Sequence, residues 1–509
     1  MRIDRFALAV ALTASLAQAQ QSQPPASSAN QEPVALTIYN QDFAVARTSF
    51  GLDLHPGLNE ITTTRVTSML EPDSVVLRDA ASKLPIQVIE QNYDAAVVNQ
   101  DWMLQKYEGK TIDFQVSSPE GLKPMPGKII RAGYTRPASY AVNGQYINPQ
   151  QAQPLIEFEG HMQFSLPGLP LFPSATDGLL LKPTLRWQIN STATAHLNAE
   201  LAYITGGLDW DATYNVIAPQ NEDVTAAEKV DFVGWVTIHN QSGTDFDQAR
   251  IKLMAGDVAK IRQGGYGGGV SMAKQAVMVM GAVSAPEVTQ KAFDDFHLYD
   301  LNRTVALHDG ETKQVQFIDA AGVSMRRTYS YDGLGMPLQP MYAGNVNQNQ
   351  GYGLGNENRK VQIVEEIKNS QSNHLGMPLP AGRVRLYRRD SDGQMEFVGE
   401  NQIPHTPAEE IVKVPTGTAF DVKGSRRQTN FHAEYNQRIM DESFEIKITN
   451  QKQQPATVSV IEHMYRCDNW EITAKSADFK KLDSHTLEFP LQVPAKGEAV
   501  LTYTIHYTW

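Results

Sequence analysis

NSQSNHLGMPLPAGRVRLYRRDSDGQMEFVGENQIPHTPAEEIVKVPTGTAFD, residues 369–421, combines two alternating strands, a tight turn and a histidine-bearing loop. The runs RVRLYRR and QMEFVGE flank Asp390, Asp392 and Gly393, and Asp and Gly tolerate the positive φ that a hairpin turn requires. The prolines of LGMPLPAG exclude a helix and leave backbone groups free to line a groove. The segment therefore predicts antiparallel β structure with an irregular loop beside it.

Strand-like alternation continues on both sides of this segment. Phe444, Ile446 and Ile448 fall on one face of a strand and polar residues fall on the other. The run VDFVGWVTI at 230–238 is apolar on both faces, as in a central strand covered by two layers. The 36 glycines and 28 prolines interrupt such runs at short intervals. We predict an all-β, multi-sheet antiparallel β-sandwich-like protein with a small inserted β module.

The first residues have the pattern of a secretory signal peptide. Arg2 and Arg5 precede an apolar run at 6–16, and Ala17 and Ala19 form a small-x-small cleavage signal. We predict export to the periplasm or the extracellular space, with no transmembrane segment after cleavage. A net charge of -12 without a basic run argues against binding of nucleic acid. Cys467 is the only cysteine, so no intramolecular disulfide is expected.

Composition divides the chain into seven parts. The predicted parts are a signal peptide (1–19), a disordered linker (20–33), an N-terminal β domain (34–95), a small inserted β module (96–177), a β-sheet region of the main domain (178–260), a flexible Gly/Met-rich loop (261–292) and a C-terminal β-sandwich region (293–509). No internal repeat of fixed period is detectable.

The histidine loop supplies the candidate chemical groups. A metal or acid/base site needs imidazole and carboxylate groups that converge. The candidate catalytic residues are His405, Glu400 and Glu410, and the candidate metal ligands are His405, Glu409, Asp390 and Asp392. Pro404 and Pro407 bracket the histidine and favour an extended backbone, so the simpler interpretation is a connecting loop in which His405 or Thr406 satisfies backbone groups. No bound cofactor is expected.

Two other patterns have both a structural and a functional interpretation. Four aromatic residues could form a sugar-stacking platform, although aromatic residues in strands are more often core: Trp210, Tyr214, Trp235 and Tyr299. The last strand, from Leu501 to Trp509, is apolar at every second position, as the closing strand of an outer-membrane β-barrel would be.

Many short blocks of the chain resemble the bacterial family called domain of unknown function 4139. The blocks are LRW (185–187), LAYITGGLDW (201–210) with Tyr214, GW (234–235), NQSG (240–243), AGD (255–257), FHLY (296–299), ETK (311–313), LGMPLPAG (375–382), FVGE (397–400), HTP (405–407) and AFD (419–421). This resemblance implies an exported all-β protein without a settled activity. Some relatives bear a mucoidy-inhibitor label that implies cell-envelope polysaccharide, but their coiled-coil insertion has no counterpart here.

These observations predict an exported cell-envelope β protein that binds or scaffolds, with envelope polysaccharide or envelope protein as the partner. The first alternative is a metal- or carboxylate-dependent hydrolase acting on envelope polysaccharide. The second is an outer-membrane β-barrel component. The oligomeric state is left open by the sequence.

Overall fold

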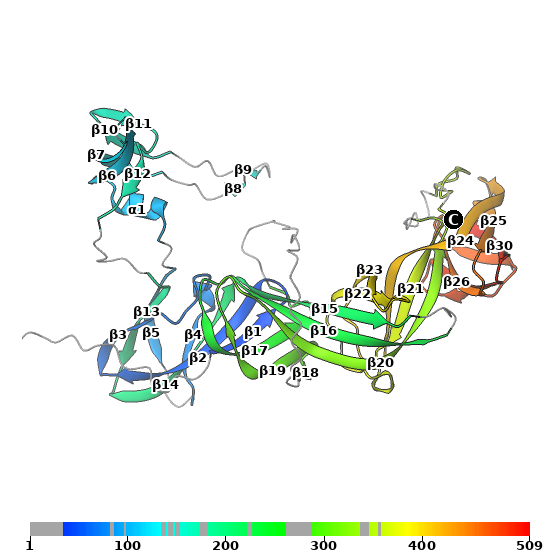
Figure 1. The fold of residues 1–509 in the computed structure, drawn as a ribbon, viewed down its shortest axis with the longest axis horizontal. Coiled ribbons are helices and arrows are strands. Elements are labelled where there is room, and N and C mark those ends of the chain that lie inside the picture. Colours follow the sequence, from blue (N-terminus) through cyan, green and yellow to red (C-terminus); the bar gives the residue numbers. More distant parts are fainter. Residues whose placement is uncertain are drawn as a thin grey trace, which may run out of the picture.

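A computed structural model describes residues 34–81, 86–95, 98–119, 121–133, 139–140, 146–147, 153–173, 181–220, 226–260, 288–335, 346–354 and 358–509. The predicted signal peptide, the predicted linker and residues 261–287 of the predicted Gly/Met-rich loop lie outside these ranges. Within them the protein is 65% strand and 3% helix, in several mostly antiparallel sheets, which confirms the predicted all-β class. Figure 1 shows an elongated body with a small module standing apart from it. None of the helices in these ranges combines the length and apolar character needed to cross a membrane.

Two sheets form the N-terminal end of the body. A seven-stranded sheet has the order β18 (Thr289–Phe293), β19 (Phe296–Leu307), β17 (Phe246–Ala255), β1 (Val34–Tyr39), β2 (Phe43–Leu54), β14 (Ala195–Gly206) and β4 (Val76–Asp79). A three-stranded sheet has the order β3 (Gly57–Thr63), β13 (Thr184–Ser191) and β5 (Gln87–Asp94). Strands from 34–95 and from 178–260 therefore share sheets. A 3-10 turn, Pro72–Ser74, precedes β4.

One thirteen-stranded sheet runs through the rest of the body. Its main path is β23 (Met395–Ile403), β22 (Gly382–Arg389), β15 (Leu208–Ala218), β16 (Glu228–Asn240), β20 (Thr312–Asp332), β21 (Lys360–Lys368), β24 (Ile411–Glu434), β25 (Ile439–Asn450), β30 (Gly497–Thr508) and β27 (Trp470–Lys475). Off this path, β26 (Ala456–His463) pairs with β20 and β29 (Thr486–Val493), and β28 (Lys480–Lys481) pairs with β29. A second 3-10 turn, Gln371–Asn373, follows β21.

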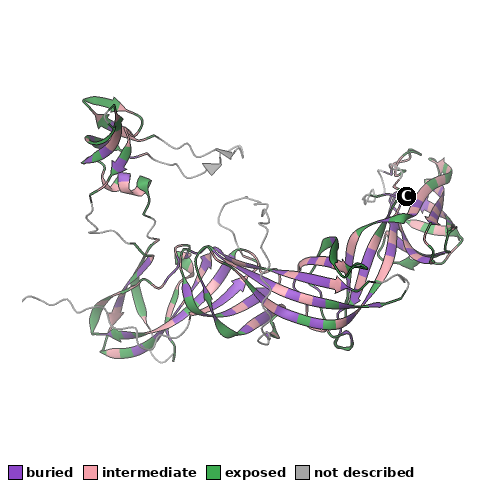
Figure 2. Ribbon diagram, viewed as in Figure 1, coloured by how far each residue is buried: buried purple, intermediate pink, exposed green. Residues whose placement is uncertain are grey.

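The body has two hydrophobic cores, and two long strands connect them. Val315 and Phe317 of β20 belong to the first core, whereas Tyr329 and Tyr331 of the same strand belong to the second. Strand β24 likewise passes from the first core to the second. Figure 2 shows buried residues along both strands. We call the parts of the body around the first and the second core the first sandwich and the C-terminal sandwich. Because β20 and β24 are continuous between the cores, both sandwiches include strands of one sheet.

Within the described residues, one four-strand unit occurs three times in succession. In each unit the first strand pairs with the fourth and the second pairs with the third, always antiparallel. The units are β16, β17, β19 and β20, then β21, β22, β23 and β24, and finally β25, β26, β29 and β30. The connecting loops differ in length, so this recurrence has no fixed period in the sequence.

A buried asparagine marks the end of the first strand in every unit: Asn240, Asn369 and Asn450, each 0% exposed. Its side-chain oxygen accepts a backbone N–H of the following loop at 3.0–3.1 Å. Its amide donates to a carbonyl of that loop at 2.8–3.0 Å. It also donates to a carbonyl at or just beyond the end of the third strand at 2.9–3.3 Å. We call this arrangement the asparagine clasp, since it ties together two loops distant in sequence.

The small module is inserted between two strands that pair with each other. Asp94 at the end of β5 is opposite Thr184 at the start of β13, so the module extends from one end of this hairpin (Figure 1). It consists of α1 (Gln100–Lys106) and a sheet of β11 (His161–Gln163), β10 (Leu155–Phe158), β7 (Gly121–Arg131), β6 (Thr111–Ser118) and β12 (Leu169–Leu171), with a separate pair of β8 (Ser139–Tyr140) and β9 (Tyr146–Ile147). These elements lie within the predicted range 96–177.

Candidate functional site

The loop that follows β21 is held on the body by buried tyrosines. Tyr214 and Tyr299 donate their hydroxyls to the carbonyls of Pro380 and Pro378, each at 2.7 Å. Burial raises the pKa of both hydroxyls above the usual value, so both keep the proton that makes the bond. Tyr214, Tyr299 and Trp210 are buried in the first core. These three rings are therefore core and not an exposed sugar-stacking platform, and the fourth candidate, Trp235, is half-buried.

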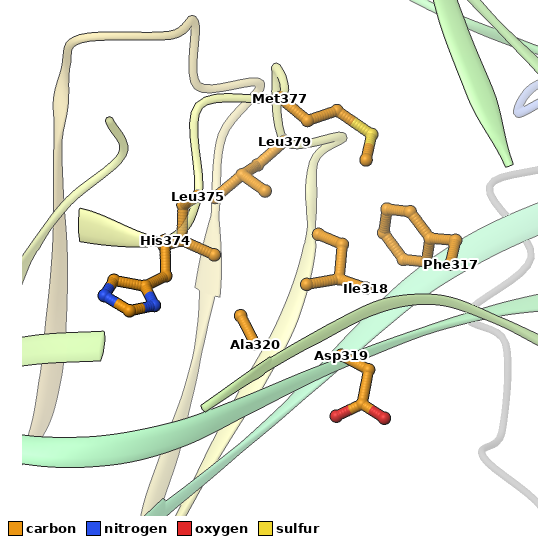
Figure 3. Close-up of a pocket in the computed structure, with 8 residues that line it drawn as sticks. All are labelled: Phe317, Ile318, Asp319, Ala320, His374, Leu375, Met377 and Leu379. Carbon is orange, nitrogen blue, oxygen red and sulfur yellow. The ribbon is translucent and has the colours of Figure 1, made fainter. Parts of the chain in front are cut away.

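A hollow of about 210 Å³ lies between this loop and β20. Figure 3 shows its lining: Phe317, Ile318, Asp319, Ala320, His374, Leu375, Met377 and Leu379. In this view His374 and Asp319 lie on opposite sides, with apolar side chains between them. The sequence predicts a groove beside LGMPLPAG (375–382). This hollow lies there, and most of the residues that line it are apolar. It is too small to enclose a drug-sized ligand, whose pockets usually exceed about 300 Å³.

His405 accepts a hydrogen bond from the backbone of this loop. Its Nδ1 accepts the N–H of Ala381 at 3.0 Å. Burial lowers the pKa of His405, the charge of Asp257 opposes this shift and the charge of His297 adds to it. The neutral ring is the form that can accept at Nδ1. Thr406 donates its hydroxyl to the carbonyl of Pro404 at 3.0 Å. The loop interpretation of the histidine motif matches this geometry.

The candidate carboxylates have separate partners. Glu400 pairs with Arg385 at 3.1 Å, and Glu409 pairs with Lys368 at 3.3 Å. Glu410 is exposed, and its backbone carbonyl accepts the N–H of Asn369. Glu400 and Glu409 therefore pair with basic residues on two different strands, β22 and β21. Among the described residues, no three or more His, Cys, Asp or Glu are grouped so that they could hold a metal ion.

Asp390 and Asp392 belong to the turn between β22 and β23. The N–H of Gly393 donates to the carbonyl of Asp390 at 2.9 Å, and Gly393 has a φ of 84°. The carboxylate of Asp392 accepts the N–H of Gln394 at 2.8 Å. This is a hairpin turn in which glycine provides the positive φ, as the sequence predicts.

A second candidate site lies on the inserted module, and its sheet register defines it. Opposed residues of antiparallel strands point to the same face. Leu169 and Leu171 are opposite Gln115 and Asp113 of β6, which are in turn opposite residues of β7. One face therefore carries six exposed apolar residues together with polar ones. The apolar residues are Leu122, Pro124, Pro126, Met162, Leu169 and Leu171, and the polar residues are Thr111, Asp113, Gln115, Ser117, Lys128 and Glu157. We call this surface the open face.

The other face of the same sheet is the core of the module. Ile112 and Phe114 of β6 and Ile129 of β7 are buried there, and Leu104 of α1 packs against them. A sheet with one buried face normally exposes polar residues on the other. The open face is mixed, because polar residues of β6 lie between the apolar residues of β7 and those of β12. The alternation of Leu122, Pro124 and Pro126 in GLKPMPGK is the sequence signal for it, but two prolines favour an irregular loop.

Comparison with known proteins gives no relative from which residues could be transferred. No protein-family model matches the chain, and no curated protein matches it. The candidate sites are therefore assigned from the geometry of the chain itself.

Proposed function

We propose that this protein is an exported cell-envelope β protein that acts by binding, and that its inserted module contacts a protein partner through the open face. The single observation that carries this proposal is that six exposed aliphatic and proline side chains share one face of a regular sheet. Exposed apolar side chains with polar residues among them suit a protein interface, which is about as apolar as the rest of a protein surface. The body acts as a scaffold that presents the module.

The chemistry of the open face favours a protein over a polysaccharide. Its Leu, Met and Pro side chains offer apolar contact area without aromatic rings, and its polar side chains can pair with those of a protein partner. Sugar recognition relies on aromatic stacking combined with hydrogen bonds. Trp210, Tyr214 and Tyr299 cannot provide such stacking, because they are buried in the first core.

The proposed location rests on the sequence. The charged start, short apolar run and Ala17 to Ala19 signal support export. The resemblance to the family called domain of unknown function 4139 also supports an exported β protein. From the short blocks that carry this resemblance, we propose that the chain belongs to that family.

The first test compares two aspartate variants with matched exposure. Leu169 on the open face is 61% exposed, and Leu58 on β3 is 63% exposed. We expect Leu169→Asp to weaken binding to the partner by about tenfold or more, because a charge would have to be desolvated in an apolar contact. Leu58→Asp should bind as the unmodified protein does. Both variants should melt normally, since exposed substitutions change stability by about 0.5 kcal/mol or less.

The measurement has two stages. Proteins that co-purify with the tagged mature chain from detergent-treated envelopes are identified by quantitative mass spectrometry. The leading candidate is then purified, and its affinity for the three forms of the chain is measured by calorimetry. Equal affinity for Leu169→Asp and Leu58→Asp would contradict the proposal.

A further inference from the structure

Trp235 differs from the three buried aromatic candidates, because it lies on the outward side of the large sheet. In β15 and β16 the even-numbered residues, such as Tyr214 and Phe232, are buried in the first core. Successive residues of a strand point to opposite sides of its sheet. Trp235, which is opposite Thr213 of β15, therefore points away from the first core.

The sheet register places arginines of β22 on the same side as Trp235. Residues paired across neighbouring strands share a side of the sheet. Thr213 of β15 pairs with Trp235 of β16 and with Arg383 of β22, and this register continues along the three strands. We call this outward surface the arginine face, and its central residues are Thr213, Asn215, Trp235, Arg383, Arg385 and Tyr387. Asn215 is buried, and the other five are half-buried.

Arginines recur on the outward side of β22, in a chain whose net charge is -12. Arg383, Arg385 and Arg389 stand at alternate positions of this strand, so all three point outward. Arg385 pairs with Glu400 of β23 at 3.1 Å. Arg383 takes part in no ion pair among the described residues. A planar guanidinium suits a carboxylate, which it binds through two parallel hydrogen bonds.

The acidic residues of the neighbouring strands do not neutralise Arg383. Asp211 of β15 lies 3.4 Å from His239, with which it shares a hydrogen bond. Asp231 and Asp319 are exposed on β16 and β20, which are two and three strands away from β22. The guanidinium of Arg383 is therefore available for a carboxylate that comes from outside this chain.

Asn215, at the centre of the arginine face, has an unsatisfied acceptor. It is 9% exposed, and its side-chain oxygen has no hydrogen-bond partner among the described residues. Its neighbours across the two ladders are Val233 and Arg385. Buried polar atoms without partners are rare and call for a missing donor. The side chain of Arg385 has many rotamers, so it can turn aside and admit a ligand hydroxyl.

Aromatic rings border the arginines on this face. Phe397 of β23 is opposite Tyr387 and is 57% exposed. The two rings meet edge to face, with centroids 5.8 Å apart. Gln402 of β23 is exposed and opposite Arg383, so amide groups lie beside the charge as well. Rings beside amide and hydroxyl groups suit a sugar, which has both apolar C–H faces and hydroxyls.

We propose that the arginine face binds an acidic polysaccharide whose sugar rings carry carboxylates. Arg383 pairs with a carboxylate, and Asn215 accepts a hydrogen bond from a sugar hydroxyl. The rings of Tyr387 and Phe397 contact the apolar faces of the sugars. This site is separate from the open face, and either one can fail without the other.

Three probes separate the contributions of charge and sugar. Calorimetry measures the affinity of the full mature chain for oligogalacturonate, for its methyl ester and for a polyglutamate peptide. The ester keeps the sugar ring but has no charge, so it should bind at least about tenfold more weakly, because the charge-assisted pair is lost. Polyglutamate keeps the carboxylates without the rings and should also bind at least about tenfold more weakly, because stacking is lost.

Two arginine variants form a matched pair. Arg383 and Arg250 both lie on inner strands, β22 and β17, and neither takes part in an ion pair among the described residues. Arg383→Met should weaken binding of oligogalacturonate by about tenfold or more, and Arg383→Lys should have a smaller effect, since it keeps the charge without the planar fork. Arg250→Met should bind normally. Leu169→Asp on the open face should also bind oligogalacturonate normally.

Two further variants test the polar and aromatic contacts. Asn215→Val should weaken binding by about threefold or more without lowering the melting temperature, because the oxygen it removes has no partner in the unbound chain. Phe397→Ala should weaken binding by about threefold or more. Phe293→Ala on β18 is its control, since Phe293 is 53% exposed and Phe397 is 57% exposed.

Several results would overturn the proposal. One is that oligogalacturonate does not bind at millimolar concentration, and another is that its methyl ester binds equally well. Polyglutamate that binds as tightly as oligogalacturonate would assign the face to an acidic protein. Equal affinities of Arg383→Met and Arg250→Met would contradict the role of Arg383. An Asn215→Val protein that binds normally but melts at a lower temperature would show that Asn215 has only a structural role.

Discussion

Replacing Arg466 by methionine is expected to lower the free energy of unfolding of the C-terminal sandwich by about 3–5 kcal/mol. Arg466 and Glu442 are both 0% exposed and lie 2.6 Å apart. Burial alone would lower the pKa of Arg466, but the hydrogen bond and charge of Glu442 keep it above the usual value. The guanidinium is thus charged in the folded state. Its removal leaves the Glu442 carboxylate buried without its counter-charge, which is the costly outcome.

The measurement is urea denaturation of the mature protein, with hydrogen exchange of β25 and β30 as the local readout. Arg427→Met is the control, because Arg427 pairs with Glu445 at the surface and is 70% exposed. That variant should lose about 1 kcal/mol or less. The double variant Arg466→Met with Glu442→Leu should recover much of the loss, since no buried charge remains unpaired. An Arg466→Met protein as stable as the unmodified chain would contradict the assigned pairing.

Replacing Asn369 by alanine is expected to destabilise the first sandwich by about 3 kcal/mol or more, because each buried polar group left without a partner costs about 1–3 kcal/mol. The change removes bonds to the carbonyls of Met377 and Pro407 and to the N–H of Gly376. These groups belong to two loops that the asparagine clasp joins. Denaturation of the purified variant, compared with the unmodified protein, measures the loss.

Asn401 is the matched control for the asparagine clasp. It is exposed, its amide donates to the carbonyl of Pro415 at 3.0 Å, and its side-chain oxygen accepts the N–H of Gln402 at 2.8 Å. Asn401→Ala should therefore cost about 1 kcal/mol or less. Asn450→Ala should behave like Asn369→Ala, but in the C-terminal sandwich. A loss of less than about 0.5 kcal/mol in both clasp variants would contradict the role given to these residues.

The sequence predicts the fold class because burial in strands alternates with a period of two. It does not predict that β24 runs from one core to the other. Between Val414 and Ala419 the buried positions change phase at an irregularity in the pairing with β21, so the alternation looks like two strands. The Ile-x-Asn pattern before each clasp is visible in the sequence. The clasp function of this asparagine is not visible in the sequence, since Asn at a strand end is also a common turn residue.

The same difference between local and long-range contacts decides which features of the candidate sites the sequence predicts. The Asp390 to Gly393 turn follows from local turn chemistry. The bond from the Ala381 N–H to His405 joins two different loops, so it is a tertiary contact. The partners of Glu400 and Glu409 lie on other strands, so sequence neighbours gave no guide to them. The open face was missed because it depends on which residues of β6, β7 and β12 are opposed. Register of this kind is a tertiary property.

Photo-crosslinking in the producing cells tests the central claim, that the open face binds a protein partner, most directly. A benzophenone amino acid is placed at position 169 or at position 58, which are 61% and 63% exposed in the native chain. We predict that position 169 yields one adduct with a different envelope protein and that position 58 does not. Equal adducts from both positions, no adduct from 169, or an adduct of only twice the protein's own mass would contradict the account.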